Sequence, residues 1–85
     1  MSDFSDFIEL IHTTRDKQLL EDLLIGVTTV QERAAIVRRV EIIKRLIAGT
    51  PQAEIAKELG VGIATVTRGS KELSQGRFAI LRKHS

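Results

Sequence analysis

The segment from Gly62 to Lys71 holds the side chains with the clearest chemistry in this 85-residue chain. A helix formed there would present a face of small, hydroxylated and basic residues: Gly62, Ala64, Thr65, Thr67, Arg68 and Lys71. Small residues let the N-terminus of a helix enter the major groove of DNA, where hydroxyl and backbone N–H groups contact phosphates and bases. A helix that only faces solvent normally carries more glutamate. The pattern therefore predicts a DNA-reading helix.

The residues around this segment have the spacing of a helix-turn-helix. In that motif two short helices cross at small residues, and a glycine forms the turn between them. Ala56, Gly60 and Val66 occupy these positions, and the predicted motif covers residues 50–73. An ordinary helical hairpin of the core is the alternative interpretation of the same spacing.

The sequence offers little support for catalysis or metal binding. The chain has no cysteine, so it lacks thiolate ligands and a thiol nucleophile. Its two histidines, His12 and His84, lie near opposite ends, and no acidic pair is placed beside a nucleophile. We therefore expect neither an enzyme nor a metal site, and we expect His12 to lie on a helix surface.

Apolar residues recur at helical spacing along the chain, which predicts an all-α fold, a short helical bundle. Ser2 or Asp3 can cap the first helix, and Thr29 with Glu32 has the form of a capping box. The first three predicted helices cover residues 3–13, a short stretch at 19–24 that ends at the run 25–28, and residues 30–48. A fourth helix has Thr50 as its cap and Pro51 as its first residue. The fifth covers residues 63–73, and a short final helix lies within 74–85.

A chain of 85 residues forms one domain at most and buries a modest part of its surface. A second subunit would supply the missing core, so we expect a homodimer. Within the single domain 1–85, we expect dimerisation helices at 1–49, a DNA-reading head at 50–73 and a short C-terminal segment at 74–85.

Charge is divided unevenly along the chain. Residues 1–32 carry two basic and seven acidic side chains, a net charge of −5, and residues 33–85 carry eleven basic and four acidic side chains, a net charge of +7. The basic part favours a polyanionic partner such as double-stranded DNA. The apolar stretches are too short to cross a bilayer and the N-terminus is acidic, so we expect a cytoplasmic protein without membrane contact.

The sequence GVGIATVTRGS, from Gly60 to Ser70, resembles the recognition-helix signature of the Trp operon repressor family. The segment from Arg39 to Gly49 is also similar to that family's central helix, and the resemblance spans roughly residues 4 to 73. It implies two chains that interlock through their N-terminal helices. It also implies that L-tryptophan binds as co-repressor between the core and the reading head, and that the liganded dimer represses its operator.

The resemblance assigns roles to individual residues. Arg39 and Arg68 match the arginines on either side of the indole ring, which agrees with the ability of guanidinium to stack on an aromatic face and to pair with a carboxylate. Thr65 and Gly69 match positions beside the ring, and Thr29 matches one at the pocket entrance supplied by the partner chain. The residues expected to contact DNA are Gln52, Lys57, Gly62, Ile63, Ala64, Thr65, Thr67 and Lys71.

The chain departs from the family pattern at several positions. Glu72 stands where the family commonly has a serine near the ligand amino group, so we assign it to the ligand site. A carboxylate there could pair with an ammonium group, or it could fill the polar end of the pocket and exclude one. Ala53 replaces an arginine that reads a guanine, so a different operator sequence is expected. Phe78 and Leu81 would have to rebuild part of the dimer's outer wall, which the family's longer last helix forms.

Two alternatives stay open. The first is a regulator of the same family that binds DNA constitutively or responds to another small molecule. The second is a helical protein-interaction module whose basic face meets an acidic partner. A melting experiment with and without L-tryptophan separates the ligand alternatives, because a ligand at a hundredfold its dissociation constant adds about 2.7 kcal/mol of stability.

Overall fold

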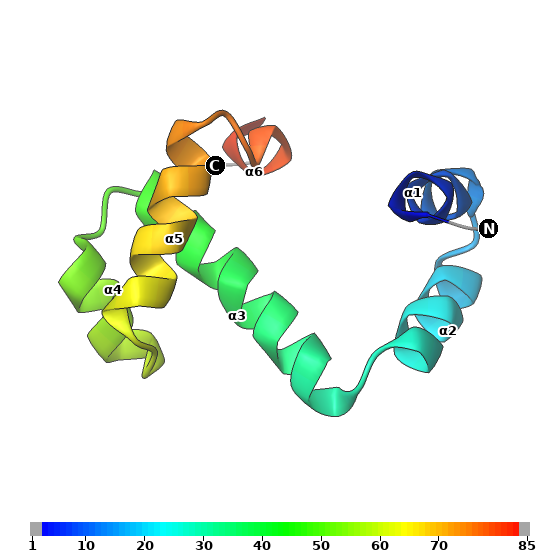
Figure 1. Ribbon diagram of the computed structural model, residues 1–85, viewed down its shortest axis with the longest axis horizontal. Helices are drawn as coiled ribbons and strands as arrows, with labels where there is room; N and C mark the ends of the chain where they lie inside the picture. Colours follow the sequence, from blue (N-terminus) through cyan, green and yellow to red (C-terminus); the bar gives the residue numbers. More distant parts are fainter. Residues whose placement is uncertain (1–2, 84–85) are drawn as a thin grey trace. The chain divides into compact units, whose positions relative to one another are not determined.

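The computed structural model describes residues 3–83, so the predicted cap Ser2 and the histidine His84 lie outside the described residues. Every regular element in this range is a helix, which confirms the all-α prediction (Figure 1). The chain divides into two compact units, residues 1–33 and 34–85. The helices in chain order are α1 (Phe4–Thr13), α2 (Lys17–Val27), α3 (Val30–Ile47), α4 (Gln52–Leu59), α5 (Ile63–Ser74) and α6 (Ala79–Lys83).

The first unit contains α1 and α2. Asp3 is the cap of α1, because its carboxylate accepts the Asp6 N–H over 3.0 Å while the Asp6 carboxylate accepts the Asp3 N–H over 3.2 Å. The Asp16 carboxylate caps α2 by accepting the N–H groups of Gln18 and Leu19 over 2.8 and 3.4 Å. The prediction of a short second helix was wrong, because α2 continues through Gly26 to Val27. A glycine inside a helix costs only about 1 kcal/mol, too little to end a helix by itself.

Side-chain hydrogen bonds hold the turn between α2 and α3. The Arg33 guanidinium donates to the carbonyl oxygens of Ile25 and Thr28 over 3.0 and 2.9 Å. The predicted capping box at the start of α3 is confirmed: the Glu32 N–H donates to Thr29 Oγ1 over 3.1 Å, and the Thr29 N–H donates to Glu32 Oε1 over 2.8 Å. These bonds satisfy backbone donors that would otherwise lack partners at a helix start.

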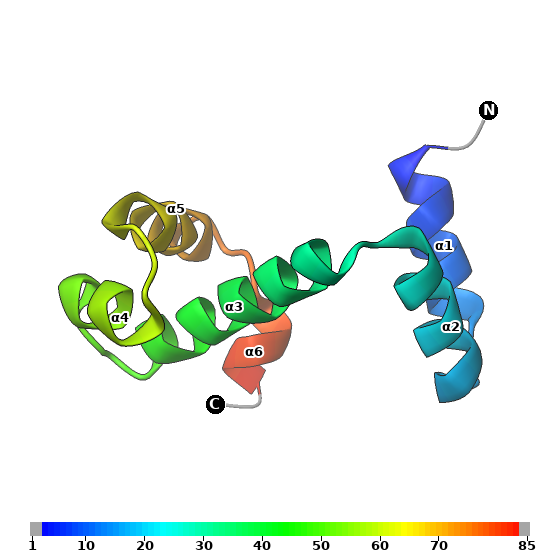
Figure 2. The same ribbon diagram turned by 90° about the horizontal axis from the view of Figure 1, so that it is seen from below.

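The second unit is built on the C-terminal part of α3, beside which α4 and α5 lie in both views (Figures 1 and 2). Its core is a cluster with one residue from each of these helices: Ile42 is 1% exposed, and Ile55 and Val66 are 0% exposed. Partly buried residues pack around the cluster, namely Leu46, Ala56, Leu59 and Val61. This packing fixes α4 and α5 to each other and to α3.

The connection between α3 and α4 differs in detail from the prediction. Gly49 ends α3 with a φ of +91°, and the Thr50 N–H donates to the Arg45 carbonyl over 3.0 Å. Thr50 is therefore part of this turn and not the cap of α4, so the predicted cap was wrong. Pro51 takes the cap position with an extended ψ of 144°, and the helix begins one residue later, at Gln52.

The turn between α4 and α5 follows the predicted form. Gly60 adopts the left-handed conformation with a φ of +64°, which costs a glycine little, and the Val61 N–H donates to the Ala56 carbonyl over 3.0 Å. Gly62 precedes α5 and supplies no side-chain cap. The helices α4 and α5 thus form the predicted helix-turn-helix.

Candidate functional site

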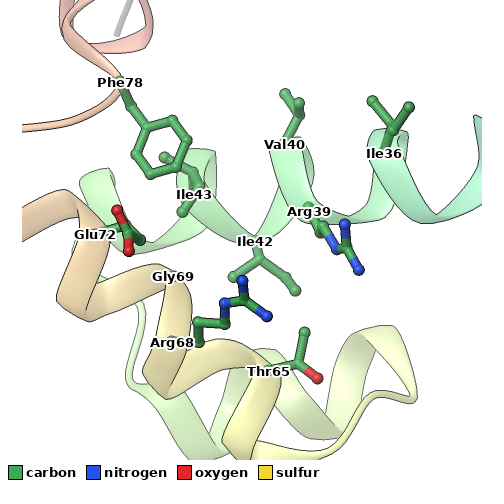
Figure 3. A pocket seen from close by; sticks show the side chains of 10 residues that line it. All are labelled: Ile36, Arg39, Val40, Ile42, Ile43, Thr65, Arg68, Gly69, Glu72 and Phe78. Atoms are coloured by element: carbon green, nitrogen blue, oxygen red, sulfur yellow. The ribbon is translucent and has the colours of Figure 1, made fainter. Parts of the chain in front are cut away.

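A pocket of about 310 Å³ lies between α3 and α5 in the second unit (Figure 3). This volume is at the lower end of the range of small-molecule sites. The lining is mostly apolar and includes two arginines, a threonine and a glutamate. The lining residues are Ile36, Arg39, Val40, Ile42, Ile43, Thr65, Arg68, Gly69, Glu72 and Phe78.

Gly69 sets how closely α5 approaches α3. A Cβ atom at this position would lie 3.0 Å from Ile43 Cδ1 and 3.5 Å from Ile42 Cγ2. The first distance is shorter than an ordinary van der Waals contact, so a larger residue would push the two helices apart or displace Ile43. The glycine is therefore needed for helix packing and for the shape of the pocket floor.

Two arginines from different helices supply the positive charge of the pocket. Arg39 comes from α3 and Arg68 from α5, and their guanidinium groups frame the Ile42 side chain in Figure 3. Within residues 3–83 neither guanidinium has a hydrogen-bond or ion-pair partner. A guanidinium stacks on an aromatic face and pairs with a carboxylate. The apolar lining with these two groups suits a small aromatic carboxylic acid.

Glu72 and Phe78 lie at the other end of the pocket. Figure 3 shows the Phe78 ring next to Ile43, with the Glu72 carboxylate nearby on α5. The Glu72 side chain is 40% exposed, and its Oε2 lies 3.4 Å from Arg77 Nε. A carboxylate at this place gives the pocket a negative end opposite its two guanidinium groups.

Five of the six predicted ligand-binding residues lie together on this pocket. The sixth, Thr29, is not among the lining residues and caps α3 as part of the first unit. Sequence reasoning missed Phe78 as a pocket residue, because it assigned this side chain to the outer wall of the dimer. The five residues that the structure brings together are Arg39, Thr65, Arg68, Gly69 and Glu72.

The predicted DNA-contacting residues lie on α4, α5 and the turn between them. Gln52 is partly buried, and its Oε1 accepts a hydrogen bond from the Thr67 hydroxyl over 2.8 Å, which joins α4 to α5. Gly62 is the N-cap residue of α5 and has no side chain that could accept a hydrogen bond from the first N–H groups of this helix. The other residues of the set are exposed: Lys57, Gly62, Ile63, Ala64, Thr65, Thr67 and Lys71.

No group of three or more His, Cys, Asp or Glu side chains that could hold a metal ion occurs within residues 3–83. Among the described helices, none is long and apolar enough to cross a membrane. His12 is exposed on α1, as predicted.

The fold and this site define a class of protein: a helix-turn-helix protein with an exposed second helix and a pocket behind it. Comparison with known proteins gives the particular family. The family model described as "Trp repressor protein" matches residues 2–81. The chain belongs to this family, whose members are regulators and not enzymes.

Several relatives are similar over most of the chain. The Trp operon repressor homolog of Vibrio campbellii is 44% identical over 72 residues, which cover 84% of this chain and 72% of the relative. The corresponding protein of Vibrio cholerae is 41% identical over 73 residues, 85% of this chain and 71% of the relative. That of Aliivibrio fischeri is 42% identical over 73 residues, 85% of this chain and 68% of the relative.

Proposed function

We propose that the chain is a homodimeric, sequence-specific DNA-binding repressor whose reading helix α5 is positioned by a small aromatic amino acid, with L-tryptophan as the first candidate. The observation that carries this proposal is the lining of the pocket. Its residues come from both α3 and α5, so an occupant contacts the reading helix and the helix that supports it. The names of the relatives, Trp operon repressor homologs, favour the same ligand and the same role.

The two arginines provide a coupling mechanism. A ligand whose ring and carboxylate contact Arg68 on α5 and Arg39 on α3 binds best when the two helices hold one particular angle. Such a ligand shifts the population of reading heads toward that angle. The size of the shift is set by the difference between the ligand's affinity for this position of the head and its affinity for the other positions. A difference of about 1–3 kcal/mol changes operator affinity by roughly five- to 150-fold.

The exposed face of α5 supports DNA reading. The long basic side chain of Lys71 suits phosphate contact, whereas Ala64 and Thr67 are short enough for base edges to approach the helix. Lys71→Ala should weaken all duplexes alike, and changes at Ala64 or Thr67 should alter sequence preference. Gel-shift titrations against a panel of single-base operator variants distinguish the two effects, and a loss of discrimination in Lys71→Ala would contradict the assignment.

Exposed apolar side chains support the homodimer. Phe4, Leu19, Val30 and Val37 are between 62% and 75% exposed in the single chain, and all lie in the part assigned to dimerisation, residues 1–49. A two-fold dimer presents two reading heads roughly 34 Å apart to successive major grooves. In this arrangement Thr29 would reach the pocket of the partner chain. Sedimentation that shows only a folded monomer at low micromolar concentration would contradict the dimer.

The proposed function is tested by selecting bound duplexes from a random pool with and without L-tryptophan, followed by calorimetry on two variants. Arg68→Ala should abolish both L-tryptophan binding and the response of operator binding to it. Arg38→Ala is the matched control, because Arg38 is an exposed arginine of α3 outside the pocket lining. Native L-tryptophan affinity in Arg68→Ala would place the ligand elsewhere. Operator binding independent of L-tryptophan in the unmodified protein would favour a constitutive or differently liganded regulator, and absence of any selected sequence would favour a protein-interaction module.

A further inference from the structure

The C-terminal end of α5 folds back toward the pocket. The Arg77 N–H donates to the Glu72 carbonyl over 3.2 Å, and the Gly76 N–H donates to the Leu73 carbonyl over 3.1 Å. These two bonds, with a Gly76 φ of +92°, form a Schellman motif, in which the second residue after the cap returns to the last turn of the helix. The turn therefore places Arg77 beside Glu72.

The side chains of these two residues form an ion pair at the edge of the pocket. Arg77 Nε lies 3.4 Å from Glu72 Oε2, and the side chains are 73% and 40% exposed, respectively. The same carboxylate belongs to the pocket lining, and of the described residues that line the pocket only Glu72 is acidic. The anionic group of the pocket is thus paired with a cation from outside the pocket.

We propose that Arg77 competes with the ligand for Glu72. In the free protein the Arg77 guanidinium pairs with the Glu72 carboxylate, and in the complex the ammonium group of an aromatic amino acid takes its place. This proposal rests on the proposed function, because it describes how the same pocket selects its ligand. Binding of a zwitterionic ligand exchanges one cation for another at Glu72. The ligand carboxylate goes to the arginine end of the pocket, and its ammonium group goes to the Glu72 end.

Two consequences distinguish this exchange from a purely structural ion pair. Glu72 favours aromatic acids that carry an ammonium group over otherwise identical acids that lack one. Arg77 reduces affinity for the first class only, because an acid without an ammonium group does not compete for Glu72. An exposed ion pair is worth up to about 1 kcal/mol, so the reduction is roughly two- to fivefold and falls as salt rises.

The test uses L-tryptophan and indole-3-propionate, which share the ring and the carboxylate and differ in the ammonium group. The protein contains neither tryptophan nor tyrosine, so indole fluorescence reports the ligand alone, and calorimetry confirms the affinities. Arg77→Gln should bind L-tryptophan about two- to fivefold more tightly and indole-3-propionate unchanged. Glu72→Gln should bind L-tryptophan about fivefold more weakly and indole-3-propionate no more weakly. In the double variant, Arg77→Gln should add nothing to the effect of Glu72→Gln.

Lys83→Gln is the control, because it removes one positive charge from exposed surface of α6. It should leave both affinities unchanged. Arg77→Gln keeps the backbone bonds of the turn, and circular dichroism verifies that each variant is folded. Equal changes for both ligands, or no change for L-tryptophan in Arg77→Gln, overturn the competition while leaving the proposed ligand intact. If the unmodified protein binds neither ligand, the proposed ligand and the competition both fail.

Discussion

Ile55 is the residue through which α4 joins the core of the second unit. Its side chain is 0% exposed and belongs to the same cluster as Ile42 of α3 and Val66 of α5. The substitution Ile55→Ala removes three carbon atoms from the centre of this cluster. Few side chains can move into the space. In the described chain the other buried apolar residues are Ile42, Ile43 and Val66, and the partly buried neighbours of the cluster are Leu46, Ala56, Leu59 and Val61.

The size of the effect follows from this burial. Each buried carbon contributes about 0.8 kcal/mol of transfer free energy, so the three removed carbons account for about 2.4 kcal/mol. Incomplete collapse of the cavity adds to this value, and we expect a loss of about 3–4 kcal/mol in the free energy of unfolding. With a urea dependence of about 1.5 kcal/mol per molar, the unfolding midpoint should fall by about 2 M.

The measurement is urea unfolding followed by circular dichroism at one fixed protein concentration, since association changes apparent stability. Ile63→Ala is the control, because Ile63 is 51% exposed on α5 and outside the core cluster. It should lower the free energy of unfolding by less than about 1 kcal/mol while changing operator affinity. A loss below about 1 kcal/mol for Ile55→Ala, or equal losses for both variants, would refute the three-helix core.

Three further substitutions test local features by the same unfolding assay. Gly60→Ala should cost about 1 kcal/mol, all of it from the left-handed backbone, because no atom lies within 4 Å of the added Cβ; Gly60→Asn should recover part of the loss. Glu58→Gln breaks the ion pair that joins α4 to Arg45 of α3 and should lower the free energy of unfolding by at most about 1 kcal/mol. At high salt the variant and the unmodified protein should be equally stable. Thr29→Ala removes the hydroxyl that caps the Glu32 N–H and should cost about 1 kcal/mol together with some helicity; an unchanged midpoint would contradict the cap.

Local sequence determined the helices and most of their ends. The capping box of Thr29 and Glu32 involves residues three apart, and Gly60 adopts a conformation that its own lack of a side chain permits. Interactions of this kind depend on a few neighbouring residues, so the sequence alone predicts them. Two predictions of helix ends were wrong. Gly26 was too weak a signal to end α2, which continues to Val27, and Thr50 belongs to the turn after α3 and does not cap α4.

The pocket depends on tertiary packing. Arg39 and Arg68 lie far apart in the chain, and only the resemblance to a known family indicated that they share a site. The close approach of α3 and α5 at Gly69 brings them together, and a helical pattern does not predict which helix faces cross. A helical pattern also does not predict that Phe78 lines the pocket or that Arg77 forms an ion pair with Glu72. Their positions follow from a turn and a packing contact that no single segment of the sequence specifies.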